Sequence, residues 1–259
     1  MRFAVIGKGF IFERHKQAIE RVGSEVTMTC DNDPDKRADH LDWLHMLNTE
    51  DFNQNVDAVS ICTPNYLHGV MVRECLLRNK KVICEKPFTI DTLAGMDGAM
   101  TILQLRKHPA LQDVEKGDIY VEAKMFRDDV YWDSWKGNSE TSGGILYNLG
   151  VHYIDLMVHI LGVHTEVLEA EITETIAKGK VKFGGYTGEF HIEIVDSRED
   201  QGRNVTVNGK EINLSNQDNL SYEDLHKDVF EDFVNDRGVG SRTAKRSLDL
   251  MMDIYEKSM

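Results

Sequence analysis

Two short stretches carry side chains whose types and spacing suit proton transfer. In "CEKPF", Lys86 follows Glu85 and precedes a proline. In "GGILYNLGVHYID", residues 143–155, His152 lies four positions after Asn148, which puts both on one face of a helix. A lysine or a histidine held beside a reacting hydroxyl group can accept its proton. These two stretches are therefore the candidate catalytic motifs.

Both motifs also have a purely structural interpretation. Lys86 can be a solvated cation that pairs with Glu85, and a histidine such as His152 on a partly apolar helix is often structural. We interpret His159 and His164 as structural or solvated. A nicotinamide cation beside Lys86 would disfavour the protonated amine, because like charges repel. The catalytic interpretation therefore depends on a cofactor site next to the lysine.

Alternating strands and helices in the first hundred residues position the first motif. Short apolar runs predict strands at 2–7, 25–30, 56–62, 80–86 and 100–106. Helical spacing of apolar residues fills 11–23 and 65–79. This alternation predicts an α/β domain with a parallel sheet and helices on both faces. Ligands of such sheets bind at the carboxyl ends of the strands.

The first strand-to-helix turn, "GKGFIFERH", resembles a dinucleotide-binding turn that lacks its last glycine. Gly7 permits the tight turn, and Gly9 lets the backbone approach a pyrophosphate at the helix N-terminus. The third glycine serves helix–strand packing, so Phe12 is tolerated there if the helix lies slightly off the sheet. Asp31 ends the second strand, where a carboxylate binds a ribose diol and repels a 2′-phosphate. These features predict an NAD site.

Polar residues also follow the third strand, in "CTPNYLH". Thr63 and Asn65 offer short polar groups beside the predicted crevice, and Asn65 could also cap the next helix. Cys30, Cys62 and Cys84 lie near strand ends. They could be reactive thiols, but we interpret them as small buried residues, which is the usual state of a free cysteine.

The composition excludes several classes of function. A net charge of -14 repels nucleic acid and anionic lipid. We find no signal peptide and no apolar run of about 18 residues that would span a membrane. The four cysteines form no C-x-x-C pair, which argues against a zinc site, and we expect reduced thiols in a cytoplasmic protein.

The pattern changes after residue 107. A strand is expected at 118–127, a helix at 141–162, and further strands at 166–176, 188–197 and 203–214. Asn208-Gly209 predicts a hairpin turn, and two helices, 222–235 and 242–257, end the chain. We therefore expect an NAD-binding Rossmann domain at 1–107 and an α+β domain for substrate binding and oligomerisation at 108–259.

The G-x-G turn, E-K-P at 85–87 and G-G-x-x-x-N-x-G-x-H-x-x-D at 143–155 together resemble the Gfo/Idh/MocA oxidoreductases. The likeness spans nearly the whole chain. It implies a Rossmann domain followed by an α+β domain with an open, mostly antiparallel sheet, which supplies substrate contacts and the oligomer interface. It also implies that Lys86 and His152 flank the nicotinamide and the carbon that is oxidised.

Longer stretches, among them "GFIFERHKQAI", "WDSWKG" and "SGGILYNLGVHYIDL", resemble the branch that oxidises UDP-N-acetylglucosaminuronic acid at C3 for O-antigen synthesis. That branch also lacks the third glycine, so Phe12 does not indicate a dead site. The family commonly has an aspartate where this chain has Asn148. The resemblance therefore implies that Asn148 hydrogen-bonds the sugar and takes no part in proton transfer.

The motifs and the resemblance together give two sets of expected contacts, and no metal is expected. The expected cofactor-binding residues are Gly7, Gly9, Phe10, Ile11, Asp31, Thr63, Asn65, His68, Glu85, Lys86 and Trp135. The expected substrate-binding residues are Lys86, Gln104, Arg106, Lys136, Tyr147, Asn148 and His152. The expected ligands are NAD and a nucleotide sugar, the expected assembly is a homodimer or homotetramer, and no nucleic-acid or membrane partner is expected.

Other functions stay open. A different sugar or polyol dehydrogenase of the same family, acting for example on an inositol, is the nearest alternative. An NAD-dependent glycoside hydrolase would release an aglycone without net NADH. A non-catalytic NAD-binding protein would be expected to lack the lysine and the histidine, and Lys86 and His152 are both present.

Overall fold

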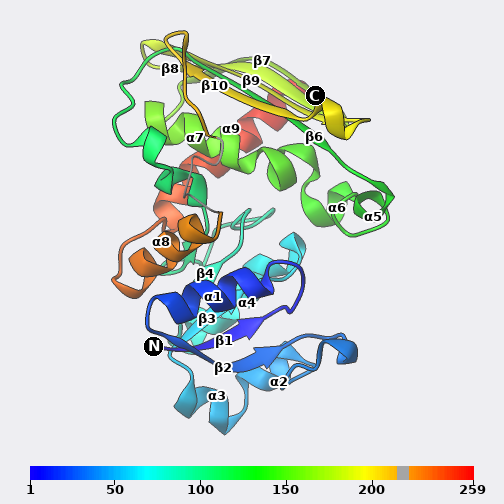
Figure 1. Ribbon diagram of the computed structural model, residues 1–259, viewed down its shortest axis with the longest axis vertical. Coiled ribbons are helices and arrows are strands. Elements are labelled where there is room, and N and C mark those ends of the chain that lie inside the picture. Colours follow the sequence, from blue (N-terminus) through cyan, green and yellow to red (C-terminus); the bar gives the residue numbers. More distant parts are fainter. Residues whose placement is uncertain (215–221) are drawn as a thin grey trace. The chain divides into compact units, whose positions relative to one another are not determined.

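The computed structural model describes residues 1–214 and 222–259, and its contacts divide the chain into two compact units (Figure 1). The first unit comprises Met1–Gln104 together with helix α8 (Tyr222–Val234) and the residues after it up to Arg242. The second unit starts at Leu105 and includes the last helix from Thr243 onward.

A five-stranded parallel sheet forms the centre of the first unit, in the order β2-β1-β3-β4-β5. Its strands are β1 (Arg2–Ile6), β2 (Glu25–Cys30), β3 (Ala58–Ile61), β4 (Lys81–Cys84) and β5 (Met100–Thr101). Its helices before α8 are α1 (Phe12–Arg21), α2 (Trp43–Leu47), α3 (Glu50–Asn55) and α4 (Asn65–Leu77). The predicted α/β Rossmann fold is confirmed, although β5 is shorter than the predicted strand 100–106.

The strand order fixes where ligands can bind. The chain leaves β1 toward one edge through α1 and leaves β3 toward the other edge through α4. Because such crossovers are right-handed, α1 and α4 lie on opposite faces of the sheet. The loops after β1 and β3 therefore meet at the switch point, and these loops carry the glycine turn and "CTPN".

Helix α8 differs from its predicted assignment to the second domain. Its buried side chains Val229, Phe230 and Phe233 join the core of the first unit, which also contains Phe3. The Phe3 and Phe230 rings lie 6.0 Å apart, centroid to centroid. The predicted boundary at residue 107 lies close to Gln104, where the first part of this unit ends. The apolar face of α8 packs on that part, although α8 is more than a hundred residues later in the sequence.

The second unit is built on a six-stranded sheet in the order β11-β10-β6-β9-β8-β7. Its strands are β6 (Ile119–Phe126), β7 (Glu166–Ile172), β8 (Ile176–Phe183), β9 (Tyr186–Val195), β10 (Gly202–Val207) and β11 (Lys210–Glu211). Only the β6–β9 pair is parallel, so the expected open, mostly antiparallel sheet is confirmed. The hairpin at Asn208-Gly209 is confirmed too, with φ of 52° and 72°.

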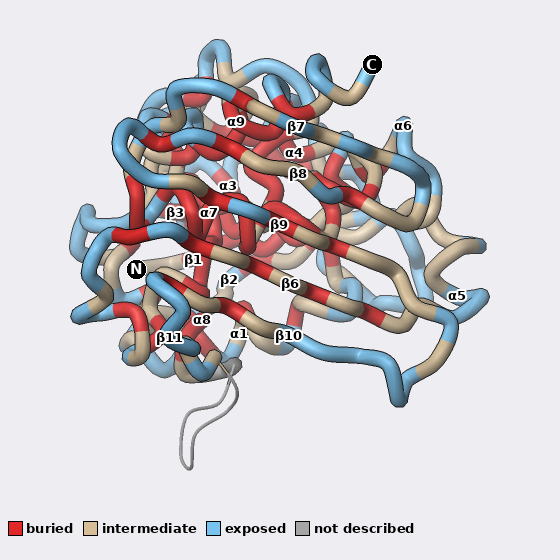
Figure 2. The backbone as a smooth tube through the Cα atoms, turned by 90° about the horizontal axis from the view of Figure 1, so that it is seen from above, coloured by how far each residue is buried: buried red, intermediate tan, exposed pale blue. Residues whose placement is uncertain are grey.

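Strand β8 was not predicted, since a lysine at every second position and Gly179 obscure its apolar alternation. The structure shows that alternation clearly, because buried and accessible residues alternate along β6, β8 and β9 (Figure 2). Helices α7 (Val151–Leu161) and α9 (Ser241–Ser258) lie along one face of this sheet (Figure 1). Short helices α5 (Asp129–Trp132) and α6 (Ser139–Ser142) and a π-turn (Leu146–Gly150) precede α7.

Within the described residues, one helical stretch, Ser139–Leu161, is long and apolar enough to cross a membrane by length and composition, which the sequence analysis did not anticipate. In its most apolar window, 72% of the residues are buried inside the protein. Core helices of globular domains pass the same test, and α7 within this stretch packs against β6 and β9.

The packing of α8 gives a stability prediction. Phe230→Ala removes a fully buried ring, and we expect it to lower the free energy of unfolding by about 3–5 kcal/mol, because the cavity cannot refill. Denaturant unfolding followed by circular dichroism measures this loss. Leu77→Ala is the control, since the Leu77 side chain is 75% exposed. Equal midpoints for the two variants would contradict the assignment of α8 to this core.

Candidate active site

The glycine turn has the geometry of an anion-binding loop. Gly7 has φ of 96°, and a Cβ there would lie 2.7 Å from the carbonyl oxygen of Cys62, so no other residue fits. A Cβ on Gly9 would meet no heavy atom of the described residues within 4 Å, apart from its chain neighbours. That open space, at the N-terminal end of α1, fits a pyrophosphate. Phe12, at the position of the third glycine of the motif, is 8% exposed and packs into the core of the first unit.

Asp31 is tied to this turn. Its Oδ2 accepts the backbone N–H of Lys8 at 2.6 Å, and its Oδ1 accepts that of Asp33 at 2.9 Å. A carboxylate has about four acceptor sites, so both oxygens can still accept ribose hydroxyl groups. The two backbone bonds fix the position of the carboxylate beside the turn.

The loop after β3 is held by a buried histidine. The ring of His68 contacts the carbonyl oxygen of Thr63 at 2.9 Å and that of Pro87 at 2.7 Å, and burial lowers the pKa of His68. His68 is fully buried, so it can affect a cofactor only through these two backbone segments. Helix α4 begins at Asn65 itself, with Pro64 in the N-cap position, so Asn65 is the first helical residue and not the predicted cap.

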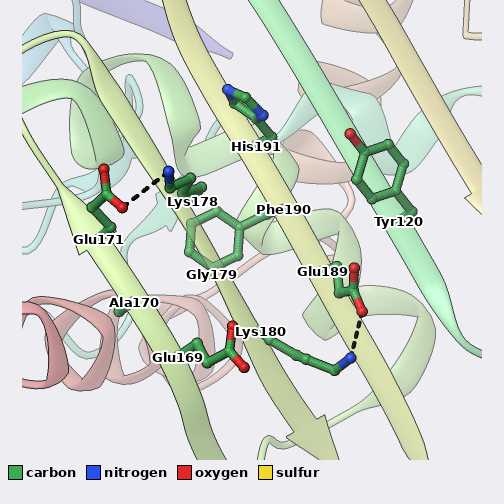
Figure 3. A pocket seen from close by; sticks show the side chains of 10 residues that line it. All are labelled: Tyr120, Glu169, Ala170, Glu171, Lys178, Gly179, Lys180, Glu189, Phe190 and His191. Carbon is green, nitrogen blue, oxygen red and sulfur yellow. Dashed lines mark hydrogen bonds and ion pairs between the residues drawn. The ribbon is translucent and has the colours of Figure 1, made fainter.

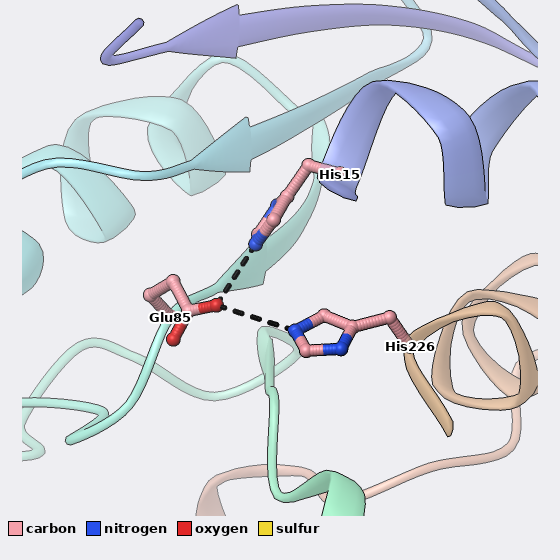
Figure 4. A group of neighbouring side chains, drawn as sticks. All are labelled: His15, Glu85 and His226. Carbon is pink, nitrogen blue, oxygen red and sulfur yellow. Dashed lines mark hydrogen bonds and ion pairs between the residues drawn. The ribbon is translucent and has the colours of Figure 1, made fainter. Parts of the chain in front are cut away.

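Glu85 points into a buried polar cluster (Figure 4). Its Oε1 lies 2.9 Å from Nε2 of His15 and 3.9 Å from Nε2 of His226, and its Oε2 accepts the Lys86 backbone N–H at 3.0 Å. Burial raises the pKa of Glu85, but its contacts with His15 and His226 outweigh burial and hold that pKa well below its usual range. We did not predict His15 or His226 as site residues.

Two histidines and a glutamate could also be ligands of a metal ion. Ligand atoms of a tetrahedral zinc ion lie about 3.4 Å apart, for bonds of about 2.1 Å. The 2.9 Å between His15 and Glu85 is instead the length of a hydrogen bond. We therefore interpret the cluster as hydrogen-bonded.

The same cluster contains Ser60 and Cys62, which lie 2.8 Å and 3.1 Å from Nδ1 of His15. The arrangement has the residue types of a nucleophilic triad, but Ser60 is fully buried and Cys62 is 8% exposed. Burial raises the pKa of Cys62 well above its usual value. All four cysteines are free and buried, and burial was predicted for Cys30, Cys62 and Cys84.

Two hydrogen bonds hold Asn148 in the second unit. Its Nδ2 donates to the Tyr131 hydroxyl at 3.0 Å and to the carbonyl oxygen of Lys136 at 3.3 Å. These bonds join the G-G-x-x-x-N motif to the "WDSWKG" segment. Asn148 and His152 lie on the π-turn and the first turn of α7.

Two cations lie beside this group. The Arg127 guanidinium lies 5.3 Å from the Tyr131 ring centroid, and the Lys136 amine lies 5.9 Å from that of Trp135. Burial lowers the pKa of both cations, and the Arg127 charge lowers that of Lys136 further. No carboxylate of the described residues forms an ion pair with Arg127. Neither Arg127 nor Tyr131 was predicted, since both lie just before the quoted "WDSWKG" stretch and outside it.

Arg106 has a different environment from the predicted one. Its Nε and one terminal nitrogen donate to the Asp155 carboxylate at 2.7 and 2.6 Å, and Ser247 of α9 donates to the same carboxylate at 2.6 Å. This bidentate pair uses two of the five N–H donors of the guanidinium and balances its charge with a carboxylate. We therefore do not carry the predicted substrate contact of Arg106 into the proposal below.

Helix α9 also supports Tyr147. The Tyr147 ring stacks on Tyr255 with centroids 5.8 Å apart, and the Tyr255 hydroxyl donates to the Gly143 carbonyl at 2.9 Å. Burial raises the pKa of Tyr147 to about 12, so its hydroxyl stays protonated. The other predicted residues differ in accessibility: Phe10 is exposed, Ile11 and Trp135 are half-buried, and Gln104 is buried.

A hollow on the accessible face of the second sheet contains none of the predicted residues (Figure 3). Charged side chains dominate its lining and pair across strands, Glu171 with Lys178 at 2.9 Å and Lys180 with Glu189 at 2.6 Å. Within each pair the two charges neutralise each other, so we assign the hollow no ligand.

The two glycines give a matched pair of predictions. Gly7→Ala should lower the melting temperature and abolish NAD binding, because its methyl group meets the Cys62 carbonyl. Gly9→Ala should leave the melting temperature unchanged and weaken NAD binding at least about tenfold, because the methyl group enters the pyrophosphate space. Thermal unfolding and NAD titration measure both effects. Unchanged NAD affinity in Gly9→Ala would contradict the assigned cofactor position.

Residues 1–109 match the oxidoreductase family with an NAD-binding Rossmann fold, and residues 117–243 match the C-terminal alpha/beta domain of the same family. Curated relatives include an uncharacterised oxidoreductase of Bacillus subtilis, 27% identical over 206 residues, and the Escherichia coli 2,7-anhydro-N-acetylneuraminate hydratase, 25% identical over 204 residues. Each match covers 68% of this chain, and the chain spans only about half of these relatives (56% and 51%).

Similar solved structures include two WlbA dehydrogenases. That of Thermus thermophilus with NAD and UDP-GlcNAcA has a TM-score of 0.84 at 24% identity, over 100% of this chain and 95% of that chain. That of Bordetella pertussis with NADH and UDP-GlcNAcA has a TM-score of 0.82 at 21% identity, over 100% and 96%. At this identity the likeness shows the fold. Both family domains match in order, and the chain therefore belongs to the Gfo/Idh/MocA family of NAD-binding oxidoreductases.

Proposed function

We propose that this NAD-dependent dehydrogenase oxidises the 3-hydroxyl group of UDP-GlcNAcA, a UDP-linked N-acetylated uronic acid. The observation that carries the proposal is the pair of cations, Arg127 and Lys136, beside Asn148. The chain as a whole has a net charge of -14, so an anionic substrate needs such a local concentration of positive charge. A neutral polyol does not.

The comparisons support the same substrate class. The Thermus thermophilus and Bordetella pertussis structures contain UDP-GlcNAcA, and the chain covers nearly their whole length. A further Thermus thermophilus structure with NAD and alpha-ketoglutarate has a TM-score of 0.84 at 25% identity. A 2-oxo acid is therefore a sensible second substrate to include in an assay.

NAD, when bound, supplies the hydride acceptor. We assign its pyrophosphate to the turn of Gly7 and Gly9 and its adenosine ribose to Asp31. We assign Lys86 and His152 to the reacting hydroxyl group, where one of them accepts its proton as the carbon is oxidised. Both residues help most when the alkoxide develops, so they should act on turnover more than on binding.

An inositol dehydrogenase is the second candidate. The scyllo-inositol 2-dehydrogenase of Bacillus subtilis is 26% identical over 129 residues, and a Lactobacillus plantarum myo-inositol 2-dehydrogenase has a TM-score of 0.77 at 18% identity. Neither substrate is charged, so this function leaves Arg127 and Lys136 unexplained.

A substrate panel tests the proposal. We expect absorbance at about 340 nm, the NADH band, to rise with UDP-GlcNAcA, or a 3-keto sugar to form without that rise when 2-oxoglutarate is present. UDP-GlcNAc, myo-inositol and scyllo-inositol should give far slower turnover. Faster turnover of either inositol would overturn the proposal and favour the second candidate.

Arg127→Gln tests the anion contact. Losing a charge-assisted hydrogen bond of about 1.5–3 kcal/mol should raise the KM for UDP-GlcNAcA roughly 10–100-fold. The weak turnover of UDP-GlcNAc, which has the diphosphate but no carboxylate, separates the two anions. If its KM rises as much, Arg127 binds the diphosphate; if neither KM changes, Arg127 is not a substrate residue.

Replacement of the two proposed proton acceptors should reduce kcat. We expect Lys86→Ala and His152→Ala each to lower kcat by about 10²–10⁴-fold, with a much smaller change in nucleotide-sugar affinity. His159→Ala on the same helix is the control, since His159 is exposed. Steady-state kinetics and substrate titration measure the two effects, and unchanged turnover in Lys86→Ala would remove that residue from the mechanism.

A further inference from the structure

We propose that His15 and His226 are positioning residues, which act through the Glu85 carboxylate to hold the backbone of Lys86 in its active place. The inference rests on the proposed role of Lys86. Neither histidine can touch a substrate, since His15 is 0% and His226 is 1% exposed. Their side chains come from α1 and α8 and meet the E-K-P segment inside the first unit (Figure 4).

The direction of the hydrogen bonds follows from the chemistry of the groups. An ionised carboxylate only accepts, so Nε2 of His15 must donate to Glu85 across their 2.9 Å contact. Burial lowers the pKa of His15, which favours the neutral ring, so we assign its Nδ1 as an acceptor. The hydroxyl group of Ser60, 2.8 Å away, then donates to Nδ1. The chain of bonds runs from β3 through α1 to the carboxylate.

The other carboxylate oxygen completes the connection. Oε2 of Glu85 accepts the Lys86 N–H at 3.0 Å, and the Glu85 N–H donates to the Ile61 carbonyl at 3.0 Å. Strand β4 ends at Cys84, and the residues just after it belong to no helix or strand. The Lys86 amide therefore has a side-chain acceptor in place of a strand or helix partner. Whatever fixes the carboxylate also fixes this amide.

His226 lies near the carboxylate oxygen that accepts from His15. Its Nε2 lies 3.9 Å from the same Oε1, and its ring lies 6.0 Å from that of His15. The His15 ring also meets Phe230 of α8 edge-on, with centroids 5.4 Å apart. Because an unpaired buried charge is costly, the carboxylate stays in place only while these partners surround it. Helix α8 thereby contributes to a site formed by residues far away in the sequence.

A purely structural role predicts a different result from a positioning role. If the cluster only stabilises the fold, its loss lowers stability and leaves the turnover of the folded protein unchanged. If it positions Lys86, its loss lowers kcat in protein that is still folded. Displacement of a catalytic group by about 1 Å can cost about 100-fold in rate.

The experiment compares His15→Ala, His15→Gln and His226→Ala with Val229→Ala. Val229 lies on α8 and is buried in the same core, but it is not part of the cluster. We expect both alanine variants to lose at least about tenfold in kcat, with NAD affinity and nucleotide-sugar KM within about threefold. His15→Gln should recover much of this loss, because its amide can donate to Glu85. Val229→Ala should lose stability and keep kcat.

Amide hydrogen exchange of Lys86 gives a readout that needs no substrate. We expect His15→Ala and His226→Ala to exchange this amide at least about tenfold faster than wild type, and Val229→Ala to match wild type. Exchange at the wild-type rate in both histidine variants, or kcat losses that Val229→Ala reproduces at equal loss of melting temperature, would overturn the inference. If wild-type protein turns over neither nucleotide sugar nor inositol, the proposed function fails, and the exchange measurement alone decides the inference.

Discussion

The first unit depends on a buried negative charge. The Glu85 carboxylate lies inside the protein, where an ion without partners is strongly destabilising. Its partners are His15 on α1, His226 on α8 and the backbone N–H of Lys86. Ser60 on β3 is hydrogen-bonded to the other ring nitrogen of His15. Four segments that are distant in sequence must meet for this charge to be tolerated. The core of α1, β1 and α8 brings those segments together, so core packing and the placement of Lys86 are linked.

A second constraint acts at the glycine turn. The backbone of Gly7 passes so close to the Cys62 carbonyl that a methyl group has no place, and the Gly7 N–H donates to the Cys30 carbonyl at 2.8 Å. These contacts bind the turn to the ends of two neighbouring strands. The turn is therefore rigid before any ligand arrives, which is the condition for a preorganised anion site.

The sequence predicted features that depend on neighbours along the chain. The glycine turn, Asp31, E-K-P and the Asn208-Gly209 hairpin each follow from the backbone needs or chemistry of a few consecutive residues. His226 was missed because its partner Glu85 lies far away in the sequence, and Arg127 and Tyr131 were missed because neither belongs to a quoted motif. Arg106 was predicted as a substrate contact from the family resemblance, and spacing along the chain could not reveal that Asp155 binds its guanidinium.

Strand β8 and helix α8 show why element types were easier to predict than their partners. The lysines of β8 lie on the accessible face of its sheet, so a sequence window averages them with the apolar residues of the other face. The pattern of α8 correctly predicted a helix at 222–235. The core that accepts its apolar face is a three-dimensional property, and sequence order alone suggested the nearer domain.

In the second sheet, charge pairs alone do not define the register of neighbouring strands. On its accessible face β7 presents glutamates opposite the lysines of β8, at Glu169–Lys180 and Glu171–Lys178. Because each strand carries one sign of charge there, sliding β7 by two residues would still bring opposite charges together. On the core face the β8–β9 pair has a register signal that does not depend on charge, since Gly179 lies directly opposite Phe190 and its missing side chain makes room for the ring. The charges keep the accessible face hydrated, and Gly179 on the core face sets which residues of β8 and β9 lie opposite each other.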